Sequence, residues 1–208
     1  MRALIMAGGQ GSRINRGEKP LLLIHGRPMI SYVIDAFSAA GTDPVVAASK
    51  KTPMTMNWCR AQGIDVIRTE GMGYIQDMIE AVKKLDEQHS LFICVSDIPG
   101  ITAKIIHQIV KKHGLSGKDA CSVWIPADIV RSTGCSVTYE ERVHGVKACP
   151  AGVNILRGDR ICEPQDELRI MLNEPGLALN VNTRDDLAAA ENFLTSRPKE
   201  TVFQTHKR

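Results

Sequence analysis

The first residues that could do chemistry form a glycine-rich segment, which directly follows a short apolar run near the N-terminus. Residues 6–13 read Met-Ala-Gly-Gly-Gln-Gly-Ser-Arg. Glycine has no Cβ, so such a segment can bend tightly and present successive N–H groups to an anion. Arg13 closes the segment, and Lys19 follows before Pro20. Two cations beside an anion-binding bend could hold a triphosphate and neutralise a departing pyrophosphate.

Two common phosphate-binding motifs do not fit this segment. The dinucleotide motif G-x-G-x-x-G needs a glycine where Ile14 stands, and the motif G-x-x-x-x-G-K-[ST] does not occur in the sequence. The pattern therefore disfavours both hydride transfer and P-loop hydrolysis. A flexible surface turn with solvated charges is the alternative. The full order of strand, glycines, arginine and Lys-Pro favours the phosphate site over that turn.

A second group of candidates stands at predicted strand ends. Asp97 follows the unbroken apolar run 91–95, which is typical of a central strand covered on both faces. Ligands of open α/β sheets bind at the carboxyl ends of strands, and magnesium on phosphates needs only one or two protein oxygens. Asp97 is therefore a candidate magnesium ligand, with a turn aspartate ahead of Pro99 as the equal alternative. Asn180 and Asn182 would lie on one side of a strand, so one of them could complete the metal shell.

The elements that must position these residues alternate between short β-branched runs and amphipathic stretches, which predicts βαβ units and a mostly parallel sheet. The predicted strands cover residues 3–6, 44–48, 64–67, 91–95, 120–125, 152–156 and 177–181. The predicted helices have apolar stripes over residues 30–37, 75–85, 105–110 and 187–194. We expect Thr102 to cap the third helix, Gly41 and Gly114 to end the first and the third, and Thr183 with Asp186 to cap the last. Residues 126–147 are polar and irregular and could form a lid or small subdomain on the acceptor side.

Length and composition restrict the class of protein. The chain has 208 residues, of which 43% are hydrophobic and 24% charged, so we expect one globular domain over residues 1–196 and a charged, frayed tail at 197–208. A net charge of +3 and an aromatic content of 4% disfavour nucleic acid as a partner, whereas an anionic small molecule suits both. The first apolar run is too short for a signal peptide or a membrane span, so we expect a cytoplasmic protein. The cysteines are widely spread without a C-x-x-C pair, which predicts reduced thiols and no zinc site.

Together, these motifs resemble the nucleotidyltransferase superfamily that includes molybdenum cofactor guanylyltransferase and the sugar-phosphate nucleotidyltransferases. The resemblance rests on the segment Leu4–Arg13 and on Glu18-Lys19-Pro20-Leu21. It implies a three-layer, Rossmann-like α/β fold with a mostly parallel mixed sheet. It also implies Arg13, Lys19 and Asp97 as catalytic residues, and Asp97 and Asn182 as ligands of Mg²⁺. The residues that it places around the nucleotide are Ala7, Gly8, Gly9, Gly11, Ser12, Arg13, Lys19, Gly73 and Tyr74, and the narrower resemblance described next adds Gly152 and Asn154.

The C-terminal half narrows this resemblance to the archaeal guanylyltransferases of cobamide synthesis. The residues that carry it are Cys149-Pro150-Ala151-Gly152-Val153-Asn154, Asp166-Glu167-Leu168 and residues 180–187. It implies transfer of GMP from GTP to adenosylcobinamide phosphate, a phosphorylated corrinoid, with release of pyrophosphate. Such a phosphate nucleophile is already anionic, so the reaction needs alignment and charge neutralisation and no general base.

Several alternatives stay open in the sequence. For Gly152 and Asn154 the alternative is a glycine kink and a polar strand edge, and Tyr74 could equally serve packing. The acceptor could be molybdopterin or another phosphorylated metabolite. A nucleotide-sensing module without turnover is a rival of a different class, although two metal ligands argue against it. The resemblance also leaves a homodimer open.

Overall fold

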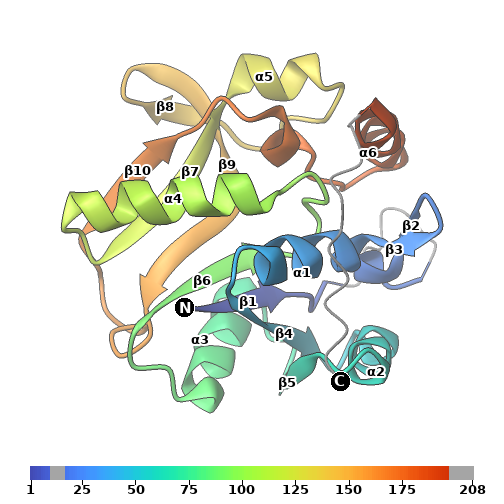
Figure 1. The fold of residues 1–208 in the computed structure, drawn as a ribbon, viewed down its shortest axis with the longest axis vertical. Coiled ribbons are helices and arrows are strands. Elements are labelled where there is room, and N and C mark those ends of the chain that lie inside the picture. The colour runs from blue at the N-terminus through green and yellow to red at the C-terminus, as the bar shows by residue number, and fades with distance from the viewer. Residues whose placement is uncertain (10–16, 197–208) are drawn as a thin grey trace.

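The computed structural model describes residues 1–9 and 17–196 and shows an eight-stranded sheet with helices on both faces (Figure 1). The strand order is β10-β7-β9-β6-β1-β4-β5, and β8 pairs with β9 outside this path. The strands of the sheet are β1 (Arg2–Met6), β4 (Asp43–Ser49), β5 (Asp65–Thr69), β6 (Ser90–Val95), β7 (Ala120–Pro126), β8 (Glu141–Val143), β9 (Val146–Arg157) and β10 (Glu167–Met171). A separate hairpin consists of β2 (Leu23–Ile24) and β3 (Arg27–Pro28).

The α-helices are α1 (Met29–Ala39), α2 (Pro53–Ala61), α3 (Tyr74–Leu85), α4 (Ala103–Ser116), α5 (Ala127–Ser132) and α6 (Arg184–Ser196). Two 3₁₀ turns, η1 (Lys19–Leu21) and η2 (Pro175–Ala178), complete the described elements. Along the described part of the chain, no helix combines the length and the apolar character that crossing a bilayer requires. The tail expected at 197–208 lies outside the described residues, and the single-domain boundary at residue 196 stays a prediction.

The alternation of side chains in β1 shows how the sheet divides the core into two layers. Ile5 faces α1 and α4, where Phe37 packs edge-on against Phe92 with ring centroids 5.2 Å apart. Leu4 faces the opposite side and packs with α3 residues such as Val82. Figure 1 shows α1 and α4 in front of the sheet. The predicted three-layer α/β fold is therefore confirmed.

Strand β9 makes the sheet mixed, because it pairs antiparallel with both β6 and β7 while the other pairs along the path are parallel. Strands β8 and β9 form a hairpin. Its two-residue turn is His144-Gly145, with φ of 50° and 82°. Positive φ at both positions is what a tight hairpin of this twist requires. Residues 126–147, which we expected to be an irregular excursion, thus contain α5 and β8, and α5 packs against β7, β9 and η2.

The prediction of a strand at residues 177–181 is wrong. The last strand is β10, and residues 175–178 form η2. Leu177, Leu179 and Val181 are buried as part of an irregular core segment, and an apolar run alone does not distinguish that from a strand. The sequence of β10, Glu-Leu-Arg-Ile-Met, instead alternates as an edge strand does.

Helix α4 begins as predicted and ends later than predicted. The Thr102 hydroxyl accepts a hydrogen bond from the Ile105 N–H at 3.3 Å and caps the helix. The helix continues through Gly114, because a single glycine inside a helix costs only about 1 kcal/mol. It ends at Gly117, which adopts the left-handed conformation with φ of 68°. The short helix α2 was not predicted.

Candidate functional site

A cavity of about 530 Å³ opens at the carboxyl ends of β1, β4, β5 and β6. Strand β1 lies between β4 and β6. The chain adds β4 and β5 on one side of β1 and then crosses to add β6 on the other, and open α/β sheets bind ligands at such a switch point. Ligand pockets usually measure roughly 300–1,000 Å³, so the cavity has room for a nucleotide. Gly8, Gly9 and Lys19, which we expect to bind the nucleotide, line it. Gly11, Ser12 and Arg13 lie outside the described residues.

The end of β1 is fixed against the end of β4. The Ser49 hydroxyl donates to the Gly8 carbonyl at 2.9 Å, and a Cβ on Gly8 would stand 3.2 Å from the Ser49 Cβ. Ala7 does not line the cavity, because it is buried in the sheet and its N–H donates to the Ala47 carbonyl at 2.8 Å. Gly8 and Gly9 therefore lie at the cavity wall and Ala7 does not, and the expected contact of Ala7 with the nucleotide stays a prediction.

The predicted cation and the predicted metal ligands meet beside this cavity. The Lys19 ammonium donates to the Asp97 carboxylate and, at 2.8 Å, to the Asn182 amide oxygen. The side chains of Lys19 and Asp97 are only 13% and 16% exposed. Asn182 also donates from its Nδ2 to the Asn180 side-chain oxygen at 2.8 Å, although these asparagines are not in a strand. We call Lys19, Asp97 and Asn182 the central cluster.

Close backbone packing brings the two halves of the central cluster together. The Val181 N–H donates to the Asp97 carbonyl at 2.9 Å. The backbones of Gly100 and Gly176 pack closely together. A Cβ on Gly100 would stand 2.3 Å from the Gly176 carbonyl oxygen. The segment that follows β6 and the segment that precedes α6 therefore run side by side, which sets Asn182 next to Asp97.

Glu18 anchors the chain that delivers Lys19. Its carboxylate accepts hydrogen bonds from the N–H groups of Met54 and Thr55 at 2.7 and 2.6 Å, and from the Thr55 hydroxyl at 2.6 Å. These groups lie in the first turn of α2, where unpaired N–H groups attract a carboxylate. Helix α2 thus holds the residue that precedes Lys19.

The loop between β5 and α3 forms another wall of the cavity. Asp77 is buried in the first turn of α3, and its Oδ1 accepts hydrogen bonds from the N–H groups of Gly71 and Met72 at 2.9 and 3.0 Å. The Lys51 ammonium donates to the Gly71 carbonyl at 2.8 Å and also lines the cavity. Gly73 has a φ of 128°, a conformation that other residues rarely adopt. The loop is therefore held rigidly, with two of its N–H groups already in use.

Tyr74 lines the same cavity, close to Asp97. Tyr74 is 43% exposed, but partial desolvation of its phenol at the cavity wall, and then the neighbouring Cys94 and Asp97, raise its pKa above the ordinary value. The hydroxyl therefore keeps its proton at neutral pH and can donate a hydrogen bond, but it cannot act as a base.

Gly152 and Asn154 lie on β9 behind the cavity and do not line it. Gly152 has a φ of 72°, and a Cβ there would stand 2.5 Å from Cγ2 of Val95, a cavity residue. Asn154 pairs with Ile93 further along the sheet. Gly152 thus leaves room for Val95, and Asn154 lies opposite Ile93, two positions before Val95 in β6.

Comparison with known proteins agrees with this geometry. Residues 3–190 match the MobA-like NTP transferase domain. The chain belongs to the MobA-like NTP transferase family. The adenosylcobinamide-phosphate guanylyltransferase of Methanocaldococcus jannaschii is 32% identical over 205 residues, which cover 93% of this chain and 97% of that protein. A molybdenum cofactor guanylyltransferase of Yersinia pestis is 25% identical over 108 residues, about half of each chain.

Solved structures show the fold of this MobA-like transferase independently. Molybdopterin-guanine dinucleotide biosynthesis protein A from Archaeoglobus fulgidus superimposes with a TM-score of 0.67 over 95% of this chain and 100% of its own, at 16% identity. The predicted nucleotidyltransferase fold is therefore confirmed, and the chain is a nucleotidyltransferase.

The central cluster of the transferase suits a hard divalent cation. Oδ1 of Asp97 is buried and has no hydrogen-bond partner among the described residues. Its other oxygen and the Asn182 amide oxygen converge on one cationic group, the Lys19 ammonium. Carboxylate and amide oxygens are ligands of Mg²⁺, which completes its shell with water and substrate phosphates. Residues 1–9 and 17–196 contain no group of three His, Cys, Asp or Glu that could hold a metal on their own.

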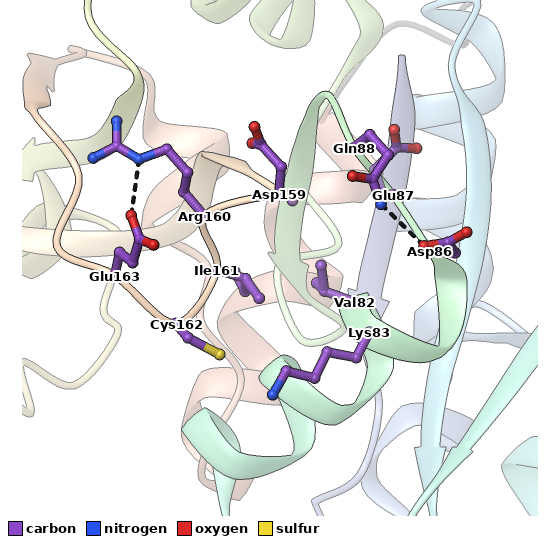
Figure 2. Close-up of a pocket in the computed structure, with 11 residues that line it drawn as sticks. Val82, Lys83, Asp86, Glu87, Gln88, Asp159, Arg160, Ile161, Cys162 and Glu163 are labelled. Atoms are coloured by element: carbon purple, nitrogen blue, oxygen red, sulfur yellow. Dashed lines mark hydrogen bonds and ion pairs between the residues drawn. The ribbon is translucent and has the colours of Figure 1, made fainter.

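A second cavity of the transferase, of about 240 Å³, lies at the opposite ends of the strands (Figure 2). Its walls precede β6 and follow β9, so it is roughly one strand length, or 20 Å, from Asp97. Charged groups on its rim pair with neighbours, as when Arg160 binds Glu163 and Asp119. One glycine, Gly158, is among its lining residues, whereas Gly8, Gly9, Gly71 and Gly73 line the first cavity.

Sequence reasoning missed Lys51, Asp77 and the anchoring role of Glu18. Lys51 could have been found, because it follows a predicted parallel strand at the ligand-binding edge. Asp77 had a weaker signal, an acidic residue in the first turn of a helix. The residues next to Glu18 do not indicate that its carboxylate binds the first turn of α2, where Met54 is 36 positions further along the chain.

Proposed function

We propose that this nucleotidyltransferase transfers GMP from GTP to adenosylcobinamide phosphate and releases pyrophosphate. The observation that carries the proposal is the central cluster, in which a lysine and two oxygen ligands from distant parts of the chain meet at the nucleotide cavity. The relative from M. jannaschii, matched over nearly its whole length, supports this acceptor.

In the proposed complex the triphosphate lies along Gly8 and Gly9 with Lys19 on its oxygens, and Arg13 is a further phosphate ligand. Asp97 and Asn182 hold Mg²⁺, which when bound neutralises phosphate charge. Lys19 exchanges its bonds to these two side chains for bonds to the triphosphate.

An acceptor phosphate oxygen then attacks the α-phosphorus. The new P–O bond forms as the bond from the α-phosphorus to the α,β-bridging oxygen breaks, and pyrophosphate leaves with that electron pair. No proton has to be removed from the nucleophile, so Tyr74 acts as a hydrogen-bond donor only.

Lys51 is our candidate for reading the base, because its ammonium lies at the loop 71–73 on the cavity wall. Guanine presents the acceptors O6 and N7, whereas adenine presents an N6 amino group in place of O6. We expect Lys51→Met to lower the preference for GTP over ATP by about 10-fold, the usual lower range for one polar base contact. The ratio of kcat/KM for the two nucleotides measures it. An unchanged ratio would remove Lys51 from base recognition.

The acceptor is tested by incubating the enzyme with GTP and either adenosylcobinamide phosphate or molybdopterin and measuring pyrophosphate release. We expect release only with the corrinoid phosphate. Release only with molybdopterin, the acceptor class suggested by the Y. pestis relative, would overturn the corrinoid assignment while keeping nucleotidyl transfer. A nucleotide sensor would be favoured if the enzyme bound GTP without turnover on either acceptor and if Asp97→Ala bound GTP as the wild type does.

A further inference from the structure

Asp186 is a fully buried acid in the first turn of α6. Its Oδ2 accepts hydrogen bonds from the N–H groups of Asn182 and Thr183 at 2.9 and 2.8 Å. Its Oδ1 accepts another from the Ser136 N–H at 2.9 Å, which comes from a segment 50 positions away. The carboxylate therefore joins two separate segments as well as capping its own helix.

A capping box alone does not explain these bonds. The box consists of the reciprocal contacts between Asp186 and Thr183, including the bond from the Asp186 N–H to the Thr183 hydroxyl at 3.1 Å. The carboxylate also accepts bonds from the N–H groups of Ser136 and Asn182, and the cap needs neither of these.

Both additional donors lie beside a cavity. Asn182 carries an oxygen of the central cluster. Ser136 begins the segment 136–139, which lines a small cavity of about 70 Å³ together with Asn180 and Asn182. Since Asn182 borders this small cavity and also contacts Lys19 and Asp97 of the nucleotide cavity, it stands between the two.

We propose that Asp186 is a positioning residue, which fixes Asn182 against Asp97 and holds the segment 136–139 in register with the central cluster. This inference rests on the proposed function, in which Asn182 is a metal ligand. Groups that orient metal ligands typically account for about 10–100-fold in metal affinity or activity.

The test replaces Asp186 with asparagine, which offers one acceptor oxygen and turns an NH₂ group toward the remaining N–H donors. Asp185→Asn is the matched control, because it makes the same charge change in the same helical turn at an exposed side chain. Binding of Mn²⁺ is measured by electron paramagnetic resonance with GTP present and no acceptor. We expect Asp186→Asn to weaken Mn²⁺ binding by about 10–100-fold and Asp185→Asn to leave it unchanged. GTP binding without metal should be the same in both.

Two further variants keep the test decisive if Asp186→Asn does not fold. Asp186→Glu keeps the charge but misplaces the oxygens, so weakened Mn²⁺ binding is again expected. Thr183→Val removes only the capping hydroxyl and should bind Mn²⁺ normally. Normal binding by a folded Asp186 variant, or equal weakening by Thr183→Val, would overturn the positioning role. If Asn182→Ala itself binds Mn²⁺ normally, the metal site of the proposed function fails instead.

Discussion

Replacing Lys19 with alanine will lower kcat by about 100–1,000-fold, as the loss of one preorganised group on developing phosphate charge usually does. The variant should stay folded, with a free energy of unfolding lower by about 1–3 kcal/mol because Asp97 loses its charged hydrogen-bond donor. Initial rates with saturating GTP and acceptor measure the first effect, and chemical denaturation measures the second.

The matched control for this variant is Lys50→Ala. Lys50 forms an ion pair with Glu70 in which both side chains are about half exposed, at 50% and 51%. Such pairs contribute little, so both turnover and stability should stay close to those of the wild type. Wild-type turnover in Lys19→Ala would contradict the phosphate role of the central cluster.

The second large effect is expected from Gly100→Ala. The new Cβ would stand 2.3 Å from the Gly176 carbonyl oxygen and 2.8 Å from its Cα, and backbone cannot rotate away as a side chain can. We expect a loss of about 3 kcal/mol of unfolding free energy, the upper end of the usual cost of overpacking. The segment that carries Asn182 must also move away from Asp97, so the metal concentration needed for half-maximal activity should rise.

Denaturation curves and metal activation curves, recorded where the variant is folded, measure these two effects. Gly114→Ala is the control, because no described atom lies within 4 Å of a Cβ at that position in α4. It should be as stable as the wild type or up to about 1 kcal/mol more stable. A folded Gly100→Ala enzyme with a normal metal requirement would show that this close packing does not set the geometry of the central cluster.

General rules applied to the sequence predict where Asp97 lies, whereas Asn182 could not be placed in this way. Parallel strands bring their carboxyl ends to one edge of the sheet, so Asp97 after the most apolar strand had to lie near the glycine segment. Asn182 was placed by resemblance to a family, and the reason offered for its direction, a strand at 177–181, was wrong. Its actual position depends on the packing of Gly100 against Gly176.

The contacts that sequence reasoning missed join one element to another, and those of Glu18 and Asp186 join segments far apart in the chain. Glu18 binds the N-terminus of α2, Asp77 holds the loop 71–73 from the next helix, and Asp186 reaches Ser136. Propensity and periodicity report local structure, so they identify α6 and its cap. They do not show that the Asp186 carboxylate also accepts a hydrogen bond from the distant Ser136 N–H. The alternation of polar and apolar residues in Glu167–Met171 is visible in the sequence and would have predicted strand β10.

The bond of Lys19 to both Asp97 and Asn182 has a consequence for the order of events in the cell. In the proposed function, the Lys19 ammonium bonds to the same oxygens that would hold the divalent ion, so a free metal ion has to compete with a tethered ammonium group. Arrival of a triphosphate gives that ammonium another anion to bind and releases the oxygens. The nucleotide and its metal are therefore expected to enter as one unit, and the idle enzyme to hold little metal of its own.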